Sequence, residues 1–78
     1  MTNEMFRAIR LYLNMTQPKF ADFLGVSPAT VGRIESGSLA VTPRVQAKLA
    51  ARFTIDDAFL SFFDNMRKIS HFNFNTSK

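Results

Sequence analysis

Residues 17–37 read QPKFADFLGVSPATVGRIESG and carry the strongest local signals for the fold. Two short segments in it, 17–24 and 28–36, each follow a hydroxyl residue and carry a proline in their first turn. This pattern predicts a helix start, because the hydroxyl caps the first turn and a proline there sacrifices no intrahelical hydrogen bond. Gly25, Val26 and the capping Ser27 alone connect the segments, and glycine permits the left-handed backbone of a tight turn. So short a connection favours a sharp crossing of two helices, with the second one presented outward.

Apolar spacing and caps predict three more helices around this pair. Residues 3–13 carry apolar side chains at helical intervals. A threonine–proline pair at 42–43 repeats the capped start, and Asp56 or Thr54 caps a fifth helix. The apolar faces of the last two helices are Val45, Leu49 and Phe53, and Phe59, Leu60, Phe63 and Met66. Only 69–74 shows a strand-like alternation. The sequence therefore predicts an all-α domain of five short helices.

The composition argues against most kinds of catalytic and metal-binding site. The chain has 78 residues, enough for one small domain with a thin core, and its nine phenylalanines and 46% hydrophobic content are typical of a chain that folds. Cysteine is absent and His71 is the single histidine, which argues against disulfides, metal centres and Ser–His catalysis. Glu35 has no second carboxylate or histidine placed to work with it as a general acid. We therefore expect no enzyme activity, no cofactor and no metal.

The sequence also argues against a membrane location. No apolar run approaches the roughly 18–20 residues that cross a bilayer. The amino terminus contains Glu4 and lacks the basic-then-apolar order of a signal peptide. We expect a cytoplasmic protein with no membrane partner.

Basic charge is concentrated in the first two-thirds of the chain. The whole sequence carries ten Lys and Arg against six Asp and Glu, a net charge of +4, and its pI is near 10.1. Residues 1–53 hold seven basic and three acidic side chains, whereas residues 54–78 hold three of each. A basic lobe suits a polyanionic partner, because contacts to phosphate release counterions. A charge of this size also serves solubility alone, so composition leaves both interpretations open.

The short helix pair resembles the Cro/repressor class of helix-turn-helix proteins, the xenobiotic-response-element-like family. The resemblance covers roughly residues 5–63, and the packing positions within it are Ala21, Gly25, Val26, Val31 and Ile34. It implies a compact, five-helix, lambda-repressor-like domain over residues 1–68, with the helix-turn-helix motif at 17–36. Residues 69–78 match nothing in the family, and they form a tail that is either disordered or part of a dimer interface.

The resemblance also implies roles for individual residues. The residues that contact base edges from the second helix of the motif, the reading helix, would be Pro28, Ala29, Thr30 and Arg33. The residues that contact the DNA backbone would be Gln17, Ser27, Ser36, Ser38 and Arg44. Gln17 would also brace the reading helix, while Ser27 is a helix cap with or without DNA. Arg10 and Glu35 match a pair that forms a buried ion pair in phage repressors of this type.

The reading helix departs from the common pattern of the family. Pro28, Ala29 and Gly32 are small where relatives often carry Gln, Asn or Ser, so they cannot make bidentate contacts to adenine. They can pack on thymine methyl groups instead, and Gly32 favours a close approach of the backbone. Hydrogen-bonded readout then rests mainly on Arg33 and Thr30, and DNA shape carries part of the specificity.

The large apolar side chains of the fifth helix predict a homodimer. Residues 52–56 replace the family's frequent Leu-Gly-Val, so the angle of this helix is not predicted. It carries more large apolar side chains than a thin core can cover, and exposed aromatic residues in a row usually mark an interface. Two reading helices related by a two-fold axis would also span neighbouring half-sites. The predicted interface is Phe59, Phe62, Phe63, Met66 and Ile69. The alternative is that residues 69–74 fold back over the fifth helix, which leaves a monomer that dimerises only on DNA.

The predicted function is sequence-specific binding of double-stranded DNA by a transcriptional regulator. A stand-alone domain of this size resembles the small Cro-like repressors of phages and mobile elements, which implies a dimer on an inverted-repeat operator, in the cytoplasm and on the nucleoid. No small-molecule ligand is expected. The alternative is a protein-interaction module on the same scaffold, such as an antitoxin or an accessory protein that binds another regulator. Gln17 and Arg33 favour DNA, since a pure interaction module needs neither at a DNA-facing position.

Overall fold

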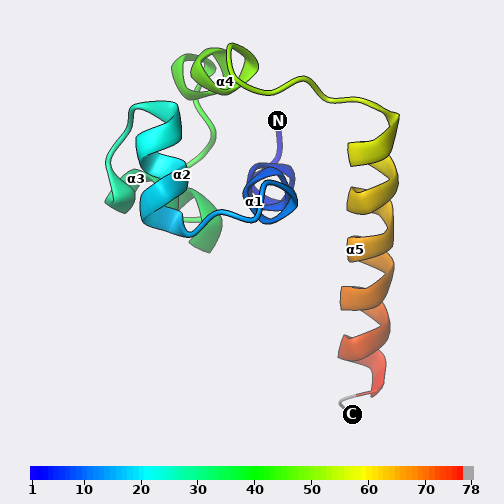
Figure 1. Cartoon of the computed structure of the whole chain (residues 1–78). Helices are drawn as coiled ribbons and strands as arrows, with labels where there is room; N and C mark the ends of the chain where they lie inside the picture. The colour runs from blue at the N-terminus through cyan, green and yellow to red at the C-terminus, as the bar shows by residue number, and fades with distance from the viewer. Residues whose placement is uncertain (77–78) are drawn as a thin grey trace.

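The computed structural model describes residues 1–76, with side chains up to Ile69, and this part of the chain forms five helices (Figure 1). They are α1 (Asn3–Tyr12), α2 (Gln17–Leu24), α3 (Pro28–Ser36), α4 (Pro43–Ala50) and α5 (Asp57–Thr76). No strand occurs among the described residues. The prediction of an all-α, five-helix domain is therefore confirmed. Residues 77–78, the end of the predicted tail, lie outside the described residues.

Local caps start all five helices. In the first four, a hydroxyl accepts a hydrogen bond from the backbone N–H three residues further on, and these caps are Thr2, Thr16, Ser27 and Thr42. For α5, Asp56 Oδ1 accepts from the Phe59 N–H across 2.9 Å, so Asp56 rather than Thr54 is the cap. Gly25 (φ 74°) and Gly37 (φ 87°) end α2 and α3 in the left-handed region. Signals within one turn of each end therefore set the helix boundaries.

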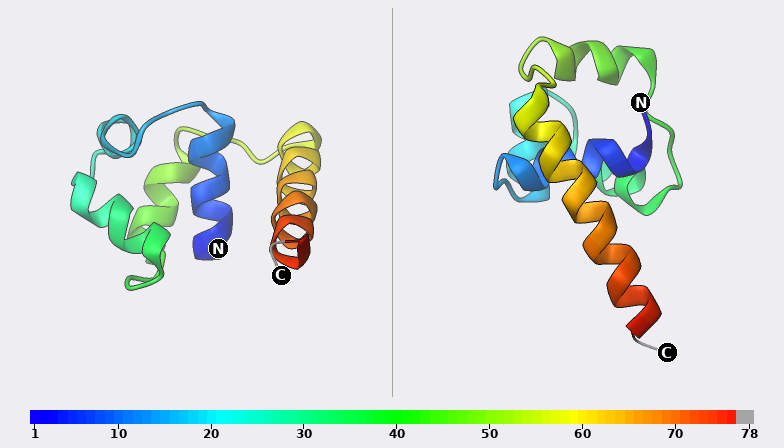
Figure 2. Two further views of the ribbon diagram at one scale, coloured as in Figure 1. Left: turned by 90° about the horizontal axis from the view of Figure 1, so that it is seen from below. Right: turned by 90° about the vertical axis from the view of Figure 1, so that its right-hand side faces the viewer.

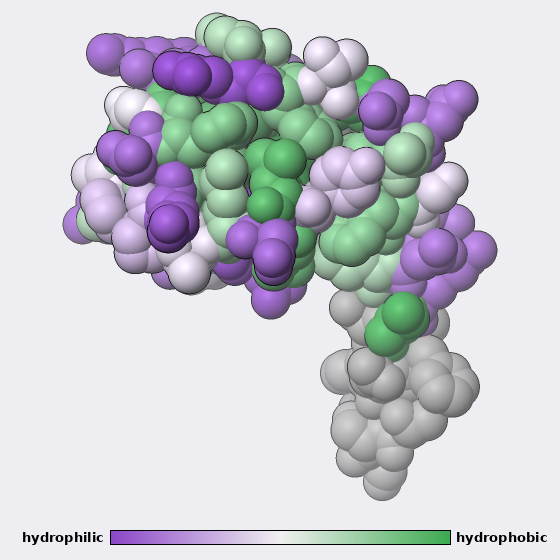
Figure 3. All heavy atoms as spheres, in the orientation of Figure 1, coloured by the Kyte–Doolittle hydropathy of each residue, from purple (hydrophilic) through white to green (hydrophobic). Residues whose placement is uncertain are grey.

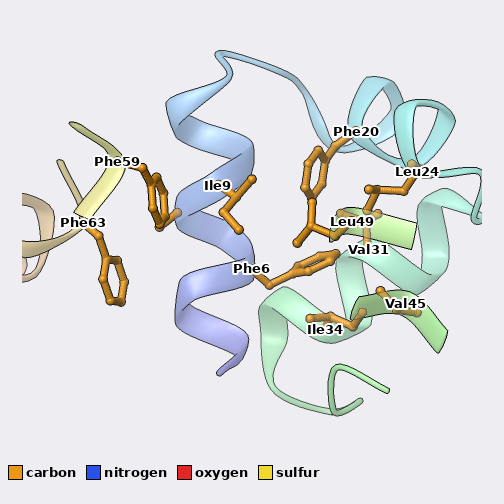
Figure 4. Packing of buried hydrophobic residues seen from close by; sticks show 12 residues of the cluster. Phe6, Ile9, Phe20, Leu24, Val31, Ile34, Val45, Leu49, Phe59 and Phe63 are labelled. Atoms are coloured by element: carbon orange, nitrogen blue, oxygen red, sulfur yellow. The ribbon is translucent and has the colours of Figure 1, made fainter. Parts of the chain in front are cut away.

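The core forms where α1 meets the helix pair α2–α3. Phe6 and Ile9 point from α1 toward these helices (Figure 4), and Phe6 packs edge-on against Phe20 with ring centroids 5.2 Å apart. The largest fully buried side chains are Phe6, Phe20, Phe59, Ile9, Ile34, Leu49 and Val31. All five helices contribute to this cluster, and each such side chain contributes about 1.5–3 kcal/mol through the hydrophobic effect. The orientation of α2 and α3 thus depends on a single shared core.

Helix α1 lies between the helix pair and α5 (Figures 1 and 2). Tyr12, at the end of α1, is the centre of an aromatic cluster, with its ring centroid 5.4 Å from Phe59 and 5.2 Å from Phe62. Phe53 joins this cluster at 6.0 Å from Tyr12. The sequence predicts Phe53 as part of the fourth helix, but α4 ends at Ala50 and Phe53 packs from the connection instead. Aromatic contacts therefore hold the α4–α5 connection and α5 against α1.

Helix α5 is 20 residues long and includes the segment 69–74. The strand-like alternation of this segment does not produce a strand, because extending an existing helix is easier than forming an isolated strand that has no sheet to join. The helix also runs on past the other helices instead of folding back (Figures 1 and 2), so the fold-back alternative is wrong. Helix α5 has no break at residue 68, the predicted edge of the domain.

Candidate nucleic-acid interface

Helix α3 turns one face into the core and the opposite face to solvent. Val31 and Ile34 are fully buried and hold the helix down. The predicted base-reading residues on the exposed face are Pro28, Ala29 and Arg33. Thr30, the fourth, is half-buried. The first two turns of α3 therefore present a small, weakly polar surface with one long cationic side chain.

Ser27 and Thr30 form a small hydroxyl pair at the start of α3. The Thr30 N–H donates to Ser27 Oγ across 3.1 Å, and the two side-chain oxygens lie 2.9 Å apart. This bonding fixes the Ser27 side chain as a cap. It also leaves the Thr30 hydroxyl with a partner already, so a contact to a base would have to use its remaining hydrogen-bonding capacity.

Arg10 and Glu35 meet in a bidentate ion pair between α1 and α3. Arg10 Nε lies 2.6 Å from Glu35 Oε2, and Arg10 Nη2 lies 2.8 Å from Oε1. Arg10 Nη1 donates to the Met15 carbonyl across 2.9 Å, which also ties the α1–α2 turn. Only 13% of the Arg10 side chain and 5% of the Glu35 side chain are exposed. The hydrogen bond to Glu35 raises the pKa of Arg10, although partial burial acts in the opposite direction.

Gln17 reaches from the first turn of α2 to α3. Its Nε2 donates to Glu35 Oε1 across 3.1 Å. Its Oε1 would lie 3.9 Å from a β-carbon added at Gly32, which is an ordinary contact distance. Gln17 thus braces α3 in the free protein, and packing inside the fold does not require glycine at position 32.

The predicted backbone-contacting serines surround the end of α3. The Arg33 carbonyl accepts from Ser36 Oγ across 3.1 Å and from Ser38 Oγ across 3.2 Å. The two serine oxygens are themselves 3.1 Å apart. Arg44 is exposed in the first turn of α4, which begins after the same connection. Hydroxyl groups and a cation therefore follow the reading helix.

Asn3 is a positioning residue that the sequence did not reveal. Its Nδ2 donates to the Ile34 carbonyl across 2.8 Å and to the Leu39 carbonyl across 2.7 Å. These bonds tie the start of α1 to the end of α3 and to the loop that holds the serines. In the sequence, an asparagine beside Thr2 reads only as a possible cap, and its partners lie more than 30 residues away.

The predicted dimer residues divide into two groups. Phe59 and Phe63 are buried in the core of one chain, whereas Phe62 and Met66 are half-buried. Ile69 is 60% exposed. On the face shown in Figure 3, hydrophobic side chains gather along the upper half of α5 and across to α1. Of the five predicted interface residues, Phe62, Met66 and Ile69 are therefore the ones with surface left for a second chain.

Two further properties bear on the type of site. Among residues 1–69, the part of the chain whose side chains the structure describes, no three His, Cys, Asp or Glu side chains come together in a way that could hold a metal ion. Within residues 1–76, no helix combines the length and the apolar character that spanning a membrane requires. The polar residues brought together by the fold are those around α2 and α3.

An exposed reading helix, braced from two sides and bordered by basic residues and hydroxyls, defines a helix-turn-helix protein. A family model described as "Helix-turn-helix" matches residues 6–60, which is most of the chain. The chain belongs to the Cro/C1-type helix-turn-helix family, and it is a DNA-binding regulator of that type. Comparisons with curated proteins and with solved structures give no match.

Proposed function

We propose that this protein is a sequence-specific regulator that binds an inverted-repeat operator as a homodimer, as small Cro-like repressors of phages and mobile elements do. The observation that carries the proposal is the cluster that Arg10 and Gln17 form around the Glu35 carboxylate. One buried carboxylate joins α1, α2 and α3 and holds α3 with its reading face exposed. Such preorganisation favours specific binding, since the reading helix needs no ordering when it meets DNA. The protein would act in the cytoplasm, on the nucleoid.

Backbone contacts would come from both ends of the motif. Gln17 at the start of α2 and Ser27 at the start of α3 are exposed, as are Ser36, Ser38 and Arg44 beyond the end of α3. Contacts of this kind position a protein on the duplex without reading its sequence. The excess of four positive charges in residues 1–53 supports contacts to several phosphates, and the affinity for DNA would therefore fall as the salt concentration rises.

Base reading would rest on Arg33, with smaller contributions from its neighbours. Arg33 is the single long polar side chain on the exposed face of α3, and a bidentate contact to guanine suits it. Pro28 and Ala29 would pack on thymine methyl groups. Thr30 would add one hydrogen bond beyond the one it shares with Ser27. Because the exposed face of α3 has so few hydrogen-bond donors, DNA shape would supply part of the specificity.

Dimerisation would use the side of α5 that carries Phe62, Met66 and Ile69. Phe62, Met66 and Ile69 lie four and three residues apart, so they share one side of the helix. Ile69 is 60% exposed and Phe62 and Met66 are half-buried, so part of this side remains accessible. A two-fold axis there would place two reading helices on successive half-sites.

The experiment is selection from random duplex DNA, followed by titration of the selected duplex and a scrambled one with wild type, Arg33→Ala and Gln17→Ala. Arg33→Ala should lose about 1–3 kcal/mol on the selected duplex and little on the scrambled one. Gln17→Ala should weaken both equally, because phosphate contacts do not specify. Failure of the wild type to bind any duplex at low salt would reject the proposal in favour of a protein-interaction module.

A further inference from the structure

Arg7 is the third polar side chain that approaches the Glu35 carboxylate beside Arg10 and Gln17. Its Nε lies 3.8 Å from Glu35 Oε1, beyond hydrogen-bonding distance, and 53% of its side chain is exposed. Glu35 already accepts two hydrogen bonds from Arg10 and one from Gln17. The carboxylate is therefore satisfied without Arg7.

The charges of this cluster do not cancel. Arg7 and Arg10 bring two positive charges to the single negative charge of Glu35. Arg10 is largely buried and pairs with Glu35 at 2.6 Å, so the surplus positive charge falls on Arg7. Because a loose and exposed ion pair contributes little in water, this charge is available to an anion that approaches from outside.

Arg7 and Gln17 converge on the same point from different helices. Arg7 Nε and Gln17 Nε2 lie 3.8 Å and 3.1 Å from the same atom, Glu35 Oε1. Both side chains are exposed, one on α1 and the other at the start of α2. A guanidinium beside an amide donor suits a phosphate group, which accepts several hydrogen bonds and matches the planar fork of arginine.

We infer that Arg7, together with Gln17, binds one phosphate of the DNA backbone beside the reading helix, and that Glu35 positions both side chains for it. The inference rests on the proposed function and adds one cationic contact to it. Because a phosphate contact carries no sequence information, Arg7 contributes equally to the affinity for every duplex.

The test compares Arg7→Gln with Arg67→Gln in the intact chain, on the selected and the scrambled duplex, over a series of salt concentrations. Arg67 is a matched control, since its Nε lies 3.7 Å from Glu4 Oε1 and its side chain is 59% exposed. It lies on α5, across α1 from the motif (Figure 1). Arg7→Gln should flatten the slope of log K against log salt by about 0.9 on both duplexes, as the loss of one phosphate contact requires. Arg67→Gln and Arg7→Lys should keep the wild-type slope.

Each other outcome has a definite meaning. If Arg7→Gln and Arg67→Gln give the same slope while the wild type binds, the inference is overturned and the proposed function stands. If Arg7→Gln melts at a lower temperature and keeps the wild-type slope, Arg7 acts only as a structural partner of Glu35, and the inference is again overturned. If the wild type binds no duplex, the proposed function fails and the inference fails with it.

Discussion

The side-chain amide of Gln17 donates a hydrogen bond to Glu35 Oε1 across 3.1 Å, so the first residue of α2 is fixed against the last turn of α3. Arg10 holds the same carboxylate from α1. One acidic side chain thus connects three helices at the end of the motif opposite the Gly25 turn. The angle between α2 and α3, on which any DNA contact depends, is held at both ends.

Glu35→Ala should strongly destabilise the protein. The change leaves the Arg10 guanidinium largely buried and without its anion, and removal of one partner from a buried pair costs about 3–5 kcal/mol. Chemical denaturation followed by circular dichroism measures the change. Asp64→Ala is the control, because the Asp64–Lys68 pair is exposed and should contribute less than about 1 kcal/mol. Equal unfolding midpoints for Glu35→Ala and wild type would contradict a structural role for the pair.

Asn3→Asp should destabilise the protein although the side chain keeps its shape. A carboxylate cannot donate, so both hydrogen bonds to the Ile34 and Leu39 carbonyls are lost, at a cost of about 1–3 kcal/mol. Asn3→Ala should lose a similar amount. The free energy of unfolding in urea measures both, and an Asn3→Asp variant as stable as wild type would rule out the clamp.

Gly32→Ala should stabilise the free protein by about 1 kcal/mol, because alanine has the higher helix propensity and the new β-carbon meets Gln17 at an ordinary 3.9 Å. On the proposed function, the same change should weaken DNA binding, since the added methyl group separates the backbone from the duplex. Gly37→Ala is the contrast and should lose about 1 kcal/mol, because φ there is 87°. Thermal melts and DNA titrations measure the two effects. A Gly32→Ala variant that binds DNA as well as wild type would remove the close-approach role.

Ile69→Glu should convert a dimer into a monomer without affecting the fold, because Ile69 is 60% exposed in the single chain. Sedimentation at tens of micromolar measures the oligomeric state. Leu60→Glu is the matched control, since Leu60 is also exposed, at 44%, but lies on the opposite side of α5 from Phe62. A monomeric wild type, or dissociation by Leu60→Glu alone, would exclude the proposed interface.

Local signals in the sequence are enough to predict the helices of the first two-thirds of the chain. Caps at Thr16, Ser27 and Thr42 and the left-handed glycines at 25 and 37 act within one turn, so their effect can be read without knowing the fold. Apolar spacing likewise predicted the buried faces of α1 and α3. The pair Arg10–Glu35 came from the resemblance to a family, since nothing in the spacing of residues 25 apart predicts contact.

Which side chains meet and which remain exposed depends on how the helices pack against one another. Apolar spacing places Leu60 on one face of the fifth helix with Phe59 and Phe63, but the way α5 lies against α1 buries the two phenylalanines and leaves Leu60 44% exposed. The clamp from Asn3 and the approach of Arg7 to Glu35 likewise depend on how the helices cross. Local signals fix a helix because its hydrogen bonds span four residues, whereas contacts between helices depend on packing of the whole core.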